Sequence, residues 1–180
     1  MNGLFEIWKS DETRKNYVVE HGFDTYDEAR IWLRANEDKS IYDGWDLYID
    51  VDHEKIRAMS FSEKSDFVKS NIPYDFKVEA VIDPILNNLP SQVAERMMNM
   101  SRHYGINVVT FEGDFDSDVC KKGVAMFKAY TRALCDVGAI DENERLLLNL
   151  VLISERGKEA ASEFKLSRMS LFGRVTNYRV

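Results

Sequence analysis

The feature that most constrains this chain is an almost unbroken apolar run from Leu146 to Ile153. Seven of its eight residues are apolar, and only Asn149 is polar. Asp141 and Glu144 have the spacing of a capping box just before the run, which predicts a helix that starts near Asp141. A helix that is apolar on all sides is stable in water only when other protein surrounds it. Two arrangements stay open: burial at the centre of this chain, or self-association or a partner interface through this helix.

A second constraint comes from residues 45–52, where apolar and polar side chains alternate strictly. One face of this segment would carry Trp45, Leu47, Ile49 and Val51, and the other would carry Asp46, Tyr48, Asp50 and Asp52. Strict alternation predicts a strand with one buried face and one face in water. Two earlier runs, at residues 4–8 and 16–20, are rich in β-branched and aromatic residues and predict a hairpin.

The clearest local signal for a helix lies between the hairpin and the alternating strand. Thr25 and Glu28 form a capping box there. The phrase GFDTYDEA at residues 22–29 resembles the G-F-x-T-x-x-E-A phrase of several small ββα modules, among them the arm-type DNA-binding domains of tyrosine recombinases. The resemblance covers eight residues and implies the local ββα geometry, with no function attached. Residues 1–58 are therefore predicted to form a ββαβ unit, a small, mostly antiparallel sheet with one helix.

The remaining residues, 59–180, are predicted to be mainly α-helical. Gly105 predicts the end of one helix, and the β-rich residues 106–111 (INVVTF) predict a short strand after it. Residues 165–180 carry basic side chains and no acidic ones, which indicates a basic C-terminal tail. The predicted fold class is α+β, with the N-terminal ββαβ unit packed against the helical part.

The formal net charge of −7 is distributed unevenly along the chain. Residues 1–60 carry 8 basic and 14 acidic side chains, whereas residues 114–180 carry 11 basic and 10 acidic ones. An acidic N-terminal part argues against its contact with a phosphate backbone. The sequence shows no signal peptide and no apolar run of the roughly 20 residues that a membrane span needs. Cys120 and Cys135 lie too far apart on one predicted helix to pair, so we expect a cytoplasmic protein.

One acidic segment, residues 112–118, is the obvious metal candidate. Asp114, Asp116 and Asp118 have the spacing that opens a calcium loop. Such a loop needs Gly and Glu at its sixth and twelfth positions, which here are Val119 and Ala125. We therefore predict that these carboxylates favour a helix N-terminus and bind no metal.

A second acidic set, Asp46, Asp50 and Asp52, lies on the wet face of the alternating strand. A solvated strand face explains the pattern without any function. An acidic docking surface for a basic partner is the functional interpretation, and convergence on magnesium would be the catalytic one.

Basic residues form a third candidate. Lys121, Lys128 and Arg132 fall within roughly 40° of one another on a helix and would form a basic ridge. Arg168 and Arg174 continue the basic character into the tail, where aromatic residues are interleaved. These side chains are candidates for contact with an acidic partner or with nucleic acid.

No catalytic or cofactor motif is present: there is no HExxH, CxxC, GxGxxG, Walker or GxSxG sequence. The sequence thus leans against an enzyme and favours a non-enzymatic binding or regulatory protein that acts through protein–protein contacts and uses no cofactor. A small accessory protein of a phage or another mobile element would have this profile. The alternatives are a nucleic-acid-binding protein that uses the basic ridge and tail, and a metal-dependent phosphodiesterase or nuclease with a dispersed acidic site.

The absence of a metal site can be tested by thermal melts with EDTA, magnesium or calcium. We expect the three midpoints to agree within about 2 °C. Occupancy at 100 times Kd would add about 2.7 kcal/mol of stability, which raises the midpoint by several degrees for a chain of this size. A rise of that size would indicate a metal site at Asp114, Asp116 and Asp118 or at Asp46, Asp50 and Asp52.

Overall fold

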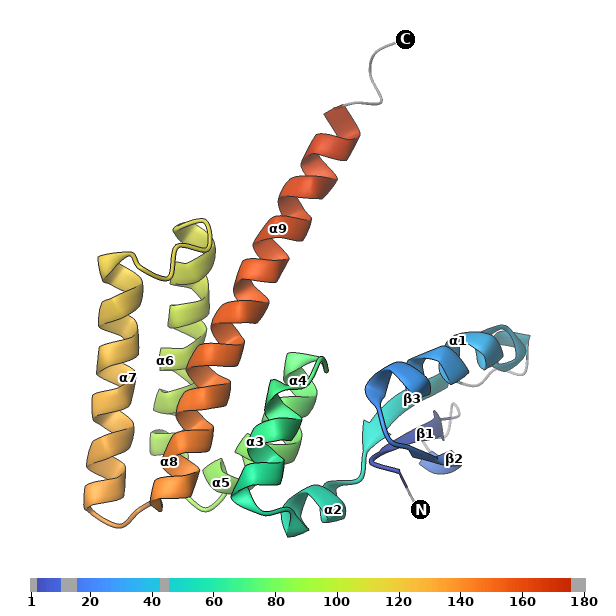
Figure 1. Ribbon diagram of the computed structural model, residues 1–180, viewed down its shortest axis with the longest axis horizontal. Helices are drawn as coiled ribbons and strands as arrows, with labels where there is room; N and C mark the ends of the chain where they lie inside the picture. Colours follow the sequence, from blue (N-terminus) through green and yellow to red (C-terminus); the bar gives the residue numbers. More distant parts are fainter. Residues whose placement is uncertain (1–2, 11–15, 43–45, 176–180) are drawn as a thin grey trace.

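The computed structural model describes residues 3–10, 16–42 and 46–175. It confirms the α+β class, with a small antiparallel sheet followed by helices (Figure 1). The N-terminal elements are β1 (Phe5–Ser10), β2 (Asn16–Phe23), α1 (Tyr26–Tyr42) and β3 (Asp46–Val51). The helical elements are α2 (His53–Ala58), α3 (Phe61–Lys69), α4 (Tyr74–Lys77), η1 (Val78–Ile82), α5 (Asp83–Leu86), α6 (Ser91–Thr110), α7 (Asp118–Asp136), α8 (Glu142–Asn149), η2 (Leu150–Glu155) and α9 (Arg156–Val175), where η marks π-helical turns.

The sheet has the strand order β2-β1-β3, and both pairs are antiparallel. This is the ββαβ unit that the sequence predicts. On β3 the expected alternation holds, since Ile49 and Val51 are buried while Asp46 is exposed. The capping box at the start of α1 is also confirmed: the Thr25 amide donates to Glu28 Oε2 at 3.1 Å, and the Glu28 amide donates to Thr25 Oγ1 at 3.3 Å. One face of the sheet is thus fixed against α1.

Aromatic rings join the sheet unit to the helices that follow it. The ring of Phe5 on β1 stacks on Phe67 of α3 at 6.4 Å, and Tyr26 of α1 lies 5.7 Å from Phe76 of α4. These contacts pack the sheet unit against the helical part, as expected from the sequence. The division of the chain into domains at residue 58 stays a prediction.

The predicted strand at residues 106–111 is wrong. Residues 106–110 lie in the last turns of α6, which runs without interruption from Ser91 to Thr110, and Phe111 is its C-cap. Gly105 does not end the helix. It is buried where α9 crosses α6, and a Cβ there would lie 2.7 Å from Arg156 Nε. Burial of Val108 on the helical face outweighs the strand propensity of the segment. Gly113, with φ +81°, lies just beyond the end of α6 instead.

The apolar run from Leu146 to Ile153 is buried at the centre of the helical part. Its side chains Leu147, Leu148, Val151, Leu152 and Ile153 are buried, whereas Leu146 is 40% exposed. Most of the run is therefore covered by the chain's own helices, which favours the first of the two arrangements. The helix does not end at Gly157, because α8, η2 and α9 follow one another without a break.

The π-helical turn η2 places polar groups inside this core. A π-turn leaves backbone carbonyl groups poorly satisfied by the helix itself, and such turns are frequent at functional sites. Here the Ser101 hydroxyl, buried on α6, donates to the carbonyl oxygen of Leu152 at 2.7 Å. The contact ties α6 to η2.

A buried ion pair connects the two π-helical segments. Lys77, directly before η1, donates to Glu155 Oε2 at 2.6 Å, and both side chains are buried. The other oxygen of Glu155 accepts a bond from Lys158 at 2.7 Å. Burial acts to raise the pKa of Glu155, but the bonds from Lys158 and Lys77 outweigh it and hold that pKa below its usual value.

The segment predicted to be a basic tail is helical as far as α9 extends, to Val175. Residues 176–180 lie outside the described residues. In the described part of the chain, no helix carries an apolar stretch of the length that crossing a bilayer demands.

The buried ion pair can be tested by comparing single and double substitutions. We expect Glu155→Leu to lower the free energy of unfolding by about 3–5 kcal/mol, because it leaves Lys77 buried without a counter-charge. The double variant Lys77→Met/Glu155→Leu should recover much of this loss. Urea titrations measure both, and a double variant no more stable than the single one would contradict the assignment.

The lowered pKa of Glu155 also gives the pair a pH dependence. A depressed folded-state pKa contributes stability above the unfolded pKa, about 4.3 for Glu, and this is lost as pH falls through the folded pKa. Between pH 5 and pH 3 the double variant should therefore lose less stability than the natural protein.

Candidate functional site

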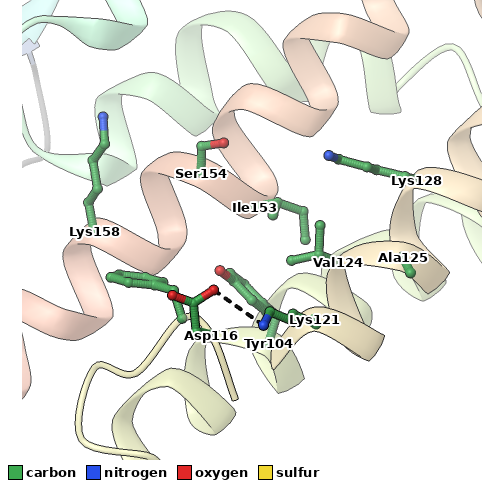
Figure 2. Close-up of a pocket in the computed structure, with 10 residues that line it drawn as sticks. Tyr104, Asp116, Lys121, Val124, Ala125, Lys128, Ile153, Ser154 and Lys158 are labelled. Atoms are coloured by element: carbon green, nitrogen blue, oxygen red, sulfur yellow. Dashed lines mark ion pairs between the residues drawn. The ribbon is translucent and has the colours of Figure 1, made fainter. Parts of the chain in front are cut away.

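A groove between α6, α7 and the junction of η2 with α9 is the candidate site (Figure 2). Its volume is about 580 Å³, within the range of pockets that hold ligands or side chains of a partner. We call it the lysine groove. Its lining consists of Tyr104, Phe115, Asp116, Lys121, Val124, Ala125, Lys128, Ile153, Ser154 and Lys158.

The floor of the lysine groove is apolar. Tyr104 and Ile153 are buried, and Phe115, 45% exposed, comes from the loop between α6 and α7. Burial raises the pKa of the Tyr104 phenol, and Cys120 raises it further, so the hydroxyl stays neutral. The floor therefore offers hydrophobic contact and no charge.

Gly157 of α9 allows this floor to form. A Cβ at this position would lie 2.9 Å from the Phe115 ring and 3.0 Å from the Tyr104 hydroxyl oxygen. Both distances are shorter than ordinary contacts, so a Cβ here would require the two rings to shift, and glycine lets them reach α9 without displacement.

Three lysines surround the apolar floor (Figure 2). Lys121 and Lys128 lie on α7, and Lys158 lies on α9. Lys121 forms an ion pair with Asp116 at 3.3 Å, and Lys158 bonds to the buried Glu155. Lys128 forms no ion pair with any residue that the structure describes. Two rim lysines are thus partly neutralised, and Lys128 presents an uncompensated positive charge to the groove.

Only some of the basic residues that the sequence singles out line the groove. Lys121 and Lys128 both line the groove. Arg132 lies outside it and forms ion pairs with Asp136 at 2.9 Å and Glu142 at 3.9 Å. The backbones of residues 168 and 174 belong to α9, but the side chains of Arg168 and Arg174 lie outside the described residues.

The acidic set on and just after β3 serves local structure at two of its three positions. Asp52 caps α2 and accepts a bond from the Lys55 amide at 3.0 Å. Burial acts to raise the pKa of Asp52, but the bonds and charge of Lys55 lower it overall. Asp50 accepts a bond from the Val51 amide at 2.7 Å, and Asp46 is exposed. Their role as a docking surface stays a prediction.

The acidic segment before α7 has a structural role. Ser117 is the N-cap of α7 and accepts a bond from the Cys120 amide at 3.3 Å. Asp116 pairs with Lys121. Among the described residues, no group of three or more histidine, cysteine, aspartate or glutamate side chains is arranged to hold a metal.

Of the residues that line the groove, the sequence singles out only Asp116, Lys121 and Lys128 as site candidates. The others include Tyr104, Phe115, Ile153 and Lys158, which come from four separate segments, so no local spacing reveals that they meet. Gly157 was the available signal, because a glycine within an otherwise helical pattern indicates close packing. The sequence alone also allows a different interpretation of this glycine, as the end of the helix or a bend in it.

The steric role of Gly157 can be tested against a second helical glycine. A Cβ on Gly123 of α7 would make only an ordinary contact of 3.6 Å with Tyr104. We expect Gly123→Ala to stabilise the protein by up to about 1 kcal/mol through helix propensity. Gly157→Ala should destabilise it by about 1–3 kcal/mol through overpacking. Equal thermal shifts for both variants would show that Gly157 is not sterically required.

Comparison of the chain with protein-family models, with curated proteins and with solved structures found no match in any of the three. What the lysine groove binds is therefore inferred from its own geometry and charges.

Proposed function

We propose that this protein is a non-enzymatic binding protein whose lysine groove holds an acidic, apolar segment of a partner protein. The observation that carries the proposal is the gathering of three lysines around an apolar floor in a chain of net charge −7. Positive charge concentrated in one cleft of an acidic protein selects an anionic partner by complementarity.

The chemistry of the groove suits a peptide segment with both apolar and acidic side chains. Tyr104, Phe115 and Ile153 would contact an apolar anchor residue, which is the usual source of affinity at an interface. Lys128 would pair with a carboxylate at the edge. The ion pairs of Lys121 and Lys158 are available for exchange, since both lysines are exposed to solvent.

Two observations support a protein partner over nucleic acid. Phosphate backbones bind through many cations along a track, whereas the groove offers three, two of them already paired. The acidic residues 1–60 would also repel a polyanion. In the groove itself, the feature that favours nucleic acid is Phe115, because an exposed ring can stack on a base.

Binding can be measured with a fluorescent 14-residue amphipathic peptide made of leucine and glutamate. We expect Lys128→Glu to weaken its binding about tenfold, which corresponds to about 1.4 kcal/mol, since like charges would then meet at the groove. Lys122→Glu is the matched control, because Lys122 is an exposed lysine of the same helix that does not line the groove. It should change Kd less than twofold.

Two results would overturn this proposal. One is an equal loss of peptide binding in both variants, which would show that the loss comes from the change in net charge and not from the groove. The other is tighter binding of a single-stranded oligonucleotide than of the peptide, with the same dependence on Lys128, which would favour nucleic acid.

A further inference from the structure

A second groove lies where the sheet unit meets α3. Its volume is about 460 Å³. The apolar part of its lining is Leu4, Phe5, Tyr26, Met59, Phe67 and Ile72. The Phe5 ring makes an edge contact with Tyr26 at 5.9 Å and stacks on Phe67 at 6.4 Å. The floor is thus an aromatic cluster shared by the sheet unit and the helical part.

Every charged residue that lines this second groove is acidic: Asp24, Asp27, Glu63 and Asp66. We call it the acidic groove. Asp27 is paired with Arg30 at 3.3 Å, and Glu63 belongs to the capping box of α3. Asp24 and Asp66 form no ion pair within the described part of the chain. Asp66 lies in the interior of α3, so helix capping does not account for it.

The C-terminal part of α9 extends beyond the helices beside it (Figure 1). The loop between α6 and α7 meets α9 at Ala161, whose Cβ lies 3.7 Å from the position of a Cβ on Gly113. From Ala161 to Val175 the helix continues for 14 residues, about 21 Å at 1.5 Å per residue. Leu166, within this extension, is 64% exposed.

The sequence of this extension complements the acidic groove. Residues 165–175 (KLSRMSLFGRV), which we call the α9 arm, contain three basic residues, no acidic residue and five apolar ones. An apolar floor rimmed by carboxylates matches a segment that combines apolar and basic side chains.

We propose that the α9 arm of one copy docks in the acidic groove of a second copy. The groove lies at α3 and the sheet unit, and the arm is a continuation of a helix that leads away from them (Figure 1). Docking therefore joins two molecules through different surfaces, a heterologous, head-to-tail contact. This self-association is separate from the lysine groove, and its surface differs from the largely buried run at Leu146–Ile153.

The test uses two charge-reversed variants and their mixture. The groove variant Asp24→Lys/Asp66→Lys keeps an intact arm, and the arm variant Arg168→Glu/Arg174→Glu keeps an intact groove. In sedimentation experiments from about 5 to 500 µM, a range suited to weak interfaces, the mass of the natural protein should rise with concentration. Each variant alone should remain monomeric, and an equimolar mixture should restore a 1:1 complex.

Matched controls reverse exposed charges on α6, at residues that belong neither to the acidic groove nor to the α9 arm. Glu95→Lys and Arg102→Glu should leave the association of the natural protein unchanged. A synthetic peptide of residues 163–175 tests the same contact without altering the protein, since an excess of it should lower the mass of the associated species.

Three outcomes would overturn this proposal: a natural protein that is monomeric throughout the range, a mixture of folded variants that does not associate, or equal loss of association in the control variants. The acidic leucine–glutamate peptide separates this result from the function of the lysine groove. Its binding should be unaffected in the groove variant, whatever the sedimentation result.

Discussion

The helical part of this protein depends on the close crossing of α6 and α9. Two glycines, one on each helix, leave space for side chains at the crossing. Gly105 leaves space for the Arg156 side chain, and Gly157 leaves space for the rings of Tyr104 and Phe115. A methyl group at either position would force the helices or their side chains apart. The crossing also sets the floor of the lysine groove, because the rings that Gly157 admits are the rings that line it.

The polar groups inside this packed region have hydrogen-bond or ion-pair partners among one another. Arg156 bonds to Glu159 at 2.7 Å and lies 5.4 Å from the centre of the Tyr74 ring. The buried pair of Lys77, directly before η1, and Glu155, at the end of η2, connects these two π-helical turns. Removing one member of such a pair costs far more than the pair contributes, so these contacts select one arrangement of the helices.

Local signals in the sequence were sufficient for the sheet unit and for the starts of α1 and α8. The capping boxes at Thr25 and Asp141 both form, because they depend on residues three positions apart. The segment at residues 106–111 is helical despite its strand propensity, because packing against a helix that is distant in sequence overrides that propensity. The same limit applies to the lysine groove: the basic ridge of α7 revealed Lys121 and Lys128, but only the fold brings Lys158 and the apolar floor beside them.

The separation of contacts along the chain has a consequence for the order in which this protein folds during synthesis. The three strands that the structure describes lie between Phe5 and Val51, so their pairing involves only residues that are close together in the chain. Lys77 and Glu155, in contrast, are separated by 78 residues. Closing such a loop is entropically costly and comes late, and nascent chains generally fold from the N-terminus. We expect the lysine to remain hydrated until α8 and η2 have been made, and the desolvation of the pair to be among the last steps of folding.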